Sequence, residues 1–185
     1  MNIFQTILIL VAAFLAVFGE ATLAAPRQWL GAQVDLLPAL MVFAALNAGL
    51  PTIALLAVFG GLWFDTLSAN PLGISILPLA IIGWPIYLRR DLILRDLPFA
   101  QFVLGAIASA AAPALTLLLL LSGGQYLLLG WGTLWQWLVM TAIGAVATPF
   151  IFKLMDTCNR ALGYQPRVEP GFRLDREIQR SRKKL

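Results

Sequence analysis

The sequence has no histidine and one cysteine, Cys158, in 185 residues. A chain with this composition can form neither an internal disulfide nor a Cys/His metal site. The commonest general acid–base side chain is also missing, and neither a suitably spaced carboxylate pair nor a phosphate-binding glycine loop is present. We therefore expect a protein that is not an enzyme and that holds neither a metal nor a cofactor.

Charged residues are also scarce. They make up 12% of the chain, against 60% hydrophobic residues, whereas a soluble domain carries about 25% charge. Up to residue 155 the chain has five basic and five acidic groups, and from Asp156 onward it has eight basic and four acidic groups. The net charge of +4 therefore belongs to the C-terminal tail. This placement argues against nucleic-acid binding by the whole protein.

Long hydrophobic runs dominate what remains. A helix that crosses a bilayer needs about 20 apolar residues. The sequence predicts an all-α integral membrane protein, a bundle of about six transmembrane helices in a domain of residues 1–158, with a cytoplasmic basic tail at 159–185. The predicted spans are residues 3–25, 30–48, 51–64, 74–88, 99–121 and 132–155.

Two parts of this count have alternatives. Glycine and proline in the segment Asn47-Ala48-Gly49-Leu50-Pro51 favour a turn between two short or tilted helices. A single kinked helix over residues 30–64 is the rival interpretation, and it gives five spans. The first apolar run has the length of a signal peptide, but no Lys or Arg precedes it and further spans follow, which favours a retained anchor.

The distribution of basic residues predicts the orientation. Twelve of the 13 lie in the 89–98 connector, in the tail or at Lys153. Cytoplasmic segments carry the excess of Lys and Arg, so the C-terminus is expected in the cytoplasm, and with six spans the N-terminus is there too. Arg89, Arg90 and Arg95 are expected at the membrane surface on anionic lipid, or else on a cytoplasmic partner. Residues 172–185 form either a short basic helix for a membrane surface or acidic partner, or a disordered end.

Small residues four apart occur in several spans. Ala12 and Ala16 share one face of the first span, Gly105 and Ser109 share a face of the fifth, and Gly144 pairs similarly with Thr148 in the sixth. Such spacing lets helix backbones approach closely in lipid. We expect these faces to pack either inside the bundle or against a partner.

Asp65 stands at the end of an apolar run, directly before a polar loop. An acidic side chain at such a place is costly unless it reaches a partner, water or headgroups. It either caps the following turn or reaches the headgroups, or else it coordinates a ligand or partner. Charge counting places it at the outer face of the membrane.

The stretch around Asp65 resembles a known motif. Residues 60–77 read GGLWFDTLSANPLGISIL, and they resemble the rod shape-determining protein MreD family, in which a transmembrane helix ends in Asp before a Leu-Ser-Gly/Ala-x-Pro-Leu-Gly loop. The matching residues are Asp65, Ser68, Asn70, Pro71 and Gly73. The order and length of the spans are similar over residues 1–160. The chain departs from the pattern by Ala69, where glycine is common, and by its basic tail.

The resemblance implies a non-enzymatic scaffold in the bacterial cell inner membrane. Such a scaffold belongs to the machinery of cell elongation, and its partners are an MreC-like membrane protein, MreB-like filaments and the peptidoglycan-synthesis enzymes. On this interpretation Pro71 and Gly73 shape the loop, and Asp65 ends the helix or contacts a partner.

The family is also similar in architecture to the substrate-binding components of energy-coupling-factor vitamin transporters, which have small-residue faces on the first helix. A small-molecule uptake subunit is therefore the alternative, and Ala12 and Ala16 fit it as well. A vitamin pocket needs converging polar side chains on the outer side. The loop between the last two spans offers only Ser122, Gln125 and Tyr126 beside glycines and leucines, which favours the scaffold.

Overall fold

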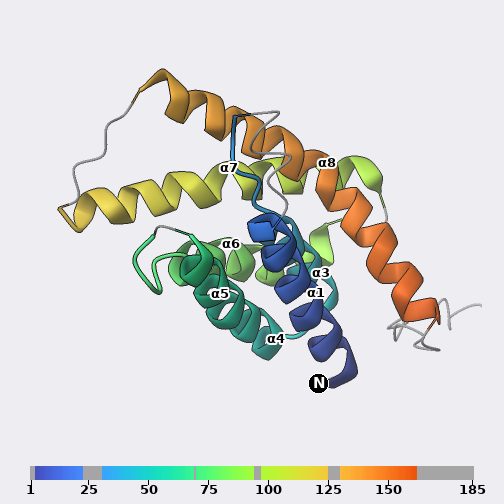
Figure 1. The fold of residues 1–185 in the computed structure, drawn as a ribbon. Helices are drawn as coiled ribbons and strands as arrows, with labels where there is room; N and C mark the ends of the chain where they lie inside the picture. Colours follow the sequence, from blue (N-terminus) through green and yellow to red (C-terminus); the bar gives the residue numbers. More distant parts are fainter. Residues whose placement is uncertain (1–2, 23–30, 69, 94–96, 125–129, 162–185) are drawn as a thin grey trace, which may run out of the picture.

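The structure, a computed structural model, describes residues 3–22, 31–68, 70–93, 97–124 and 130–161. Every regular element in these ranges is a helix (Figure 1). The elements are α1 (Ile3–Thr22), α3 (Leu37–Asn47), α4 (Leu50–Leu55), the π-helical η1 (Leu56–Gly60), α5 (Gly61–Leu67), α6 (Ile76–Leu88), the 3-10 helix η2 (Arg90–Leu92), α7 (Pro98–Ser122) and α8 (Trp131–Ala161).

Among the described residues, four helical segments are long and apolar enough to cross a membrane: Ile3–Thr22, Leu50–Leu67, Pro98–Ser122 and Trp131–Ala161. They are typical of an all-α multi-pass membrane protein, as the sequence predicts. The other two predicted spans also contain apolar helices, α3 and α6, but both are shorter than a full crossing.

The largest correction to the predicted bounds concerns the second span. Residues 31–36 are not helical, and α3 begins at Leu37 instead of residue 30. Asp35 explains this start, because its Oδ1 accepts a hydrogen bond from the Leu37 N–H at 2.9 Å, and Pro38 follows in the first turn. At the other end of the chain α8 continues to Ala161, past the predicted end at residue 155. Residues 162–185, most of the predicted tail, lie outside the described residues.

The turn predicted between α3 and α4 is present. Ala48 and Gly49 have extended backbone conformations, and α4 then begins at Leu50 with Pro51 in its first turn. A single kinked helix over this region is therefore wrong. The chain reverses here, and α4, η1 and α5 return along α3.

The core is built around α3. All residues from Leu37 to Leu46 are buried, as expected for a helix that is apolar on every side. It contacts α1, α6, α7 and α8, and the rings of Phe43 and Phe152 meet edge to face at 5.0 Å between centroids. Figure 1 shows α3 behind α1, with α7 and α8 extending away from it.

A π-turn interrupts the long helix from Leu50 to Leu67. A π-turn has one more residue than an ordinary turn of α-helix. With this turn in place, Ile53, Ala57, Gly61 and Asp65 are all buried on one side of the helix. Gly61 lies so close to α6 that a Cβ there would be 2.9 Å from the backbone nitrogen of Ile76. The start of α5 and the start of α6 therefore lie in close backbone contact.

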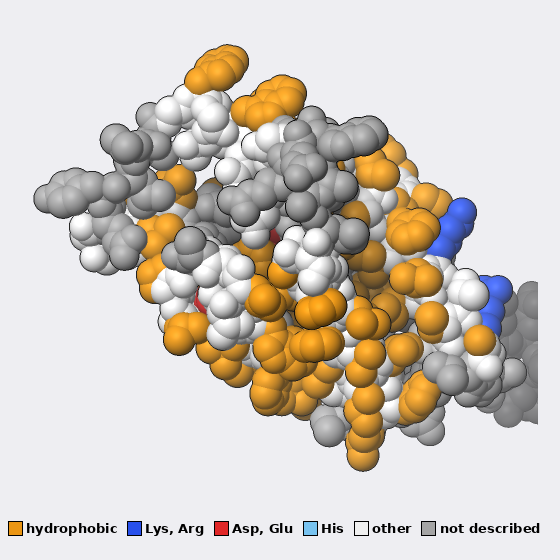
Figure 2. Space-filling view, viewed as in Figure 1, with side chains coloured by type: hydrophobic (Ala, Val, Ile, Leu, Met, Phe, Trp, Pro, Cys, Tyr) orange, Lys and Arg blue, Asp and Glu red, His pale blue; other side chains and the backbone are white. Residues whose placement is uncertain are grey.

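The outer surface is largely apolar, as a lipid-facing surface requires. Large hydrophobic side chains are exposed along α1, α6, α7 and α8. Figure 2 shows them over much of the visible face, with Lys and Arg side chains on the side where α8 ends.

Candidate functional site

Asp65 lies almost entirely inside the protein, with 2% of its surface exposed. Its Oδ2 accepts a hydrogen bond from the Ser75 N–H at 3.1 Å, and its Oδ1 accepts one from the Ser75 hydroxyl at 2.5 Å. Ser75 stands directly before α6, so the carboxylate satisfies a backbone donor at the start of that helix. Of the alternatives predicted from the sequence, a contact with headgroups does not agree with this burial, and Ser75 provides the hydrogen bonds of the carboxylate.

The motif loop closes through local contacts. Ser68 Oγ donates to the Asp65 carbonyl and accepts from the Asn70 N–H, both at 3.4 Å. The Pro71 carbonyl accepts from the Ile74 N–H at 3.3 Å. Gly73 has φ of 87°, the left-handed region in which side chains are strained. The other four motif residues thus lie between α5 and α6, directly after Asp65 in the last turn of α5.

Two more carboxylates lie at the same end of the bundle. Glu20, near the end of α1, accepts a hydrogen bond from the Leu36 N–H at 2.7 Å. Asp35 interacts electrostatically with both Glu20 and Asp65. We call this group of Glu20, Asp35 and Asp65 the acidic end. Glu20 was not among the site residues predicted from the sequence, although a charge inside the apolar run of residues 3–25 is itself a signal.

Asp35 lies between α1 and α3, outside both helices, and is half-buried. Burial raises the pKa of its carboxyl above the ordinary value, and the nearby charge of Asp65 raises it further. The hydrogen bond from the Leu37 N–H opposes this rise in pKa. In the described part of the chain no three acidic, Cys or His side chains are grouped so that they could hold a metal ion.

The opposite end of the bundle is closed by polar contacts around the α3–α4 turn. Gln5 Nε2 donates to the Asn47 carbonyl at 3.1 Å, and the hydroxyls of Thr6 and Thr52 are hydrogen-bonded at 2.8 Å. These contacts join the beginning of α1 to the end of α3 and the beginning of α4.

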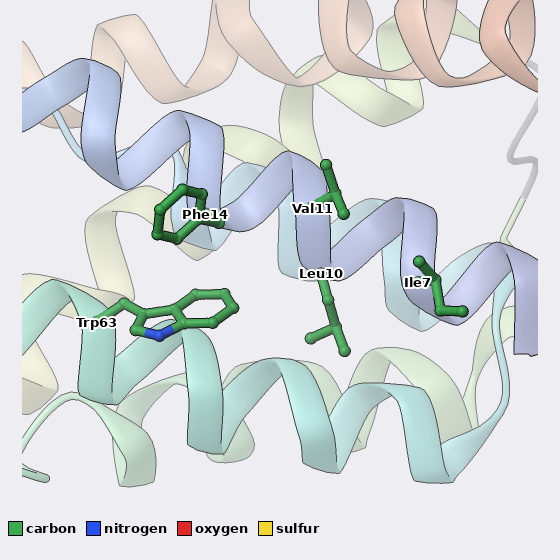
Figure 3. A pocket seen from close by; sticks show the side chains of 5 residues that line it. All are labelled: Ile7, Leu10, Val11, Phe14 and Trp63. Carbon is green, nitrogen blue, oxygen red and sulfur yellow. The ribbon is translucent and has the colours of Figure 1, made fainter.

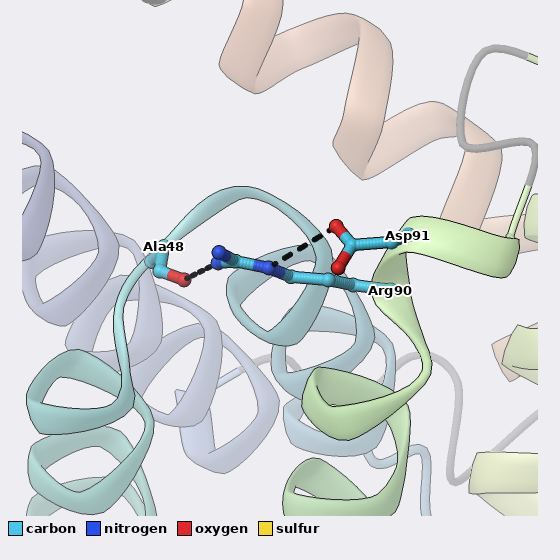
Figure 4. A network of polar contacts seen from close by, with 3 residues as sticks. All are labelled: Ala48, Arg90 and Asp91. Carbon is cyan, nitrogen blue, oxygen red and sulfur yellow. Dashed lines mark hydrogen bonds and ion pairs between the residues drawn. The ribbon is translucent and has the colours of Figure 1, made fainter. Parts of the chain in front are cut away.

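Arg90 lies at the same end of the bundle. We call this end, with Arg89 and Arg90, the basic end. Figure 4 shows the Arg90 guanidinium between the Ala48 carbonyl, at 3.4 Å, and Asp91, at 3.8 Å. It also lies 4.7 Å from the centre of the Tyr87 ring. A positive charge after the last turn of α3 complements the helix dipole. Arg90 is thus held by contacts within the protein while part of its side chain stays exposed.

The other two predicted membrane-surface residues differ from Arg90. Arg89 is exposed at the end of α6, where a headgroup can reach it. Arg95 lies outside the described residues.

The small residues of α7 and α8 face one another. A Cβ on Gly105 would overlap the Thr148 side chain, and a Cβ on Gly144 would overlap the Ser109 side chain. Each glycine therefore receives the small polar side chain of the opposite helix. The structure places the Gly105 and Ser109 face inside the bundle, against α8.

The small residues of α1 are less deeply buried than those of α7 and α8. Ala12 is partly buried and packs against the core, and Ala16 is also half-buried. The buried stripe of this helix is formed instead by Ile9, Ala13 and Val17.

A groove runs between α1 and α5 on the outer surface. It has a volume of about 240 Å³ and is lined by Ile7, Leu10, Val11, Phe14 and Trp63. Figure 3 shows Phe14 of α1 facing Trp63 of α5, and their rings meet edge to face at 5.4 Å. Aliphatic side chains and two aromatic rings do not offer the converging polar groups that hold a vitamin.

The polar groups of both ends thus mainly close helix ends and turns. Their arrangement supplies a shaped loop at the acidic end and an exposed arginine at the basic end. No family model matches the sequence, and no curated protein or solved structure matches the chain.

Proposed function

We propose that this chain is a non-enzymatic scaffold of the bacterial elongation machinery, of the MreD kind. The observation that carries the proposal is the motif of residues 60–77, which resembles that family. Its geometry supports this use, because Asp65 and Gly73 hold the loop in one shape while Leu72, 70% exposed, projects from it. A rigid loop with an exposed apolar tip suits contact with another protein.

The proposed orientation follows from the two ends of the bundle. The basic end lies in the cytoplasm, by the positive-inside bias, and the acidic end faces the periplasm. The motif loop then meets an MreC-like membrane protein, whereas Arg89 and the tail lie on the side of MreB-like filaments. Peptidoglycan-synthesis enzymes are expected to be held from within the membrane.

The alternative function is a vitamin uptake subunit. It requires a polar pocket on the outer side, and the groove between α1 and α5, with its apolar lining, is not such a pocket. The motif of residues 60–77 is what favours the scaffold.

Co-purification from membranes tests the scaffold. Leu72→Ser changes the exposed tip of the motif loop, and Leu92→Ser is its matched control, because Leu92 is a similarly exposed leucine at the basic end, with 76% of its surface exposed. We expect Leu72→Ser to reduce recovery of the MreC-like protein and Leu92→Ser to leave it unchanged. Equal recovery with all three chains would contradict a partner contact at this loop.

Asp65→Asn removes the charge at this position and keeps a side chain of the same size. We expect it to leave membrane insertion intact and to weaken recovery of the partner, and Ser75→Ala serves as the control that removes the hydroxyl hydrogen bond to Asp65 without removing the charge. Unchanged recovery with Asp65→Asn would reduce Asp65 to a structural cap.

A further inference from the structure

The two longest helices of the described protein, α7 and α8, are each buried over only part of their length. All buried residues of α7 lie between Gln101 and Ala112, and residues 113–122 are half-buried or exposed. In α8 the buried residues begin at Met140, and residues 131–139 are half-buried or exposed. The packed parts contain the crossing of the two helices. We call residues 113–122 the distal part of α7 and residues 131–139 the distal part of α8.

The distal parts extend away from the rest of the bundle. Figure 1 shows the end of α7 and the start of α8 projecting past the loop between α5 and α6, and the two helices are farther apart there than where they cross. Large apolar side chains on these parts, such as Leu118 and Leu134, are exposed. The distal part of α7 is therefore less tightly packed than the first part of the same helix.

A proline stands where the packed part of α7 ends. Pro113 directly follows Ala112, the last buried residue of the helix. Proline has no backbone N–H, so the Ser109 carbonyl four residues earlier lacks its usual helical donor, and the proline ring also crowds this carbonyl. Sharp bends in helices occur mainly at such points. The weakest point of the α7 backbone thus coincides with the change in packing.

Two side chains bind carbonyls beside this point. The Trp137 indole N–H donates to the Ala110 carbonyl at 2.8 Å, and the Thr116 hydroxyl donates to the Ala112 carbonyl at 3.0 Å. Neighbouring helices and Ser or Thr side chains commonly satisfy the backbone groups that a proline disturbs within a membrane, and a Thr that bonds four residues back often bends its helix. The Trp137 contact joins the distal part of α8 to the packed part of α7.

We propose that Pro113 is a hinge, about which the distal part of α7 moves toward and away from the distal part of α8 while the packed crossing stays fixed. Trp137 is the latch of this hinge. Its bond to Ala110, on the packed side of the hinge, keeps the two distal parts from spreading further. The device changes the apolar surface at the ends of α7 and α8 without unpacking the bundle, and it does not depend on the scaffold function.

Distances between spin labels test the hinge. In a Cys158→Ser background and in lipid nanodiscs, one label pair joins the distal parts, at Leu118→Cys and Leu134→Cys. The second pair joins the packed parts, at Phe102→Cys and Phe150→Cys, and all four positions are exposed. We expect the distance distribution of the first pair to be about twice as wide as that of the second. Equal widths would overturn the proposal.

Removal of the proline assigns the hinge to its residue. We expect Pro113→Ala to narrow the distribution of the first pair to about the width of the second, because alanine restores the N–H for the Ser109 carbonyl. Pro149→Ala is the matched control, because Pro149 also lies inside a helix but directly follows the buried Thr148 in the packed part of α8, and it should leave both widths unchanged. A first-pair width that Pro113→Ala does not reduce would overturn the proposal.

Tryptophan variants test the latch. Trp137→Phe keeps an aromatic ring but has no N–H to donate, so we expect the population at longer distances of the first pair to increase about twofold. Trp131→Phe is the control, because Trp131 lies on the same distal part and is 84% exposed, and it should leave the distribution unchanged. The same distribution with Trp137→Phe as with the wild-type chain would overturn the role assigned to Trp137.

Discussion

At the scale of single residues, Asp65 shows how a carboxylate is kept inside an apolar bundle. A buried charge is costly unless it is hydrogen-bonded, and Ser75 supplies both a backbone and a side-chain donor. The same bonds join the end of α5 to the start of α6. Asp65 therefore contributes to stability as well as to the shape of the loop.

Removal of either partner should weaken the fold. We expect Asp65→Asn and Ser75→Ala each to lower the free energy of unfolding by about 1–3 kcal/mol, because a buried polar group then loses its partner. Denaturation in mixed micelles followed by circular dichroism measures this, and the double variant should cost less than the sum of the two single changes. Strict additivity would show that the two side chains act independently.

Asp35 should make stability depend on pH. Its pKa is raised in the folded protein, so the protonated form is favoured there, and stability is full below the ordinary carboxyl pKa of about 4 and falls as pH rises through the raised value. Asp35→Asn keeps an oxygen acceptor for the Leu37 N–H without the charge. We expect a higher unfolding midpoint than wild type at neutral pH and no difference at about pH 4. A lower midpoint at neutral pH would contradict the assigned cause.

Sequence analysis predicted only part of these contacts. It left Asp65 as either a cap or a contact, and the hydrogen bonds to Ser75 were not predicted, because they depend on a loop whose path is set by Gly73. Glu20 was missed because its acceptor role depends on the Leu36 backbone of a different segment.

At the scale of helices, the crossing of α7 and α8 depends on a glycine of one helix facing a small polar residue of the other. Gly144 faces Ser109, and Gly105 faces Thr148, with no room for a further Cβ at either glycine. Close approach of this kind replaces the hydrophobic effect as the source of helix association in lipid.

An exchange of the two residues at one crossing point tests this packing. We expect Gly144→Ser to lower the free energy of unfolding by about 1–3 kcal/mol, the usual cost of overpacking, and the added change Ser109→Gly to restore most of it. Gly132→Ser on the same helix is the control, because nothing lies within 4 Å of its added Cβ. Failure of Ser109→Gly to rescue the fold would show that the crossing is not the cause.

Hydrophobic runs predicted where helices occur better than where they begin. The run from residue 30 continues without a break into α3, so its apolar character did not reveal that Asp35 starts the helix. The turn before Pro51 was predictable, because glycine and proline act on the local backbone. The π-turn at η1 was not predictable from the sequence. It accommodates the contacts of Gly61 with α6 and of Asp65 with Ser75, and these contacts form only in the folded protein.

At the scale of the whole molecule, charge is distributed unevenly. The described basic groups lie near the α3–α4 turn and the three carboxylates lie at the other end, and the orientation of these ends in the membrane stays a prediction from the sequence. Composition predicted a membrane-embedded helical bundle.

Depletion of the protein in the cells that encode it tests the proposed scaffold function most directly. Cell shape is followed by microscopy while a regulated gene copy is switched off, and vitamin uptake is measured in the same culture. We expect the cells to become round while uptake stays normal, with rod shape restored by the wild-type gene. Cells that keep their rod shape and lose uptake of a vitamin would contradict the scaffold and favour the transport subunit.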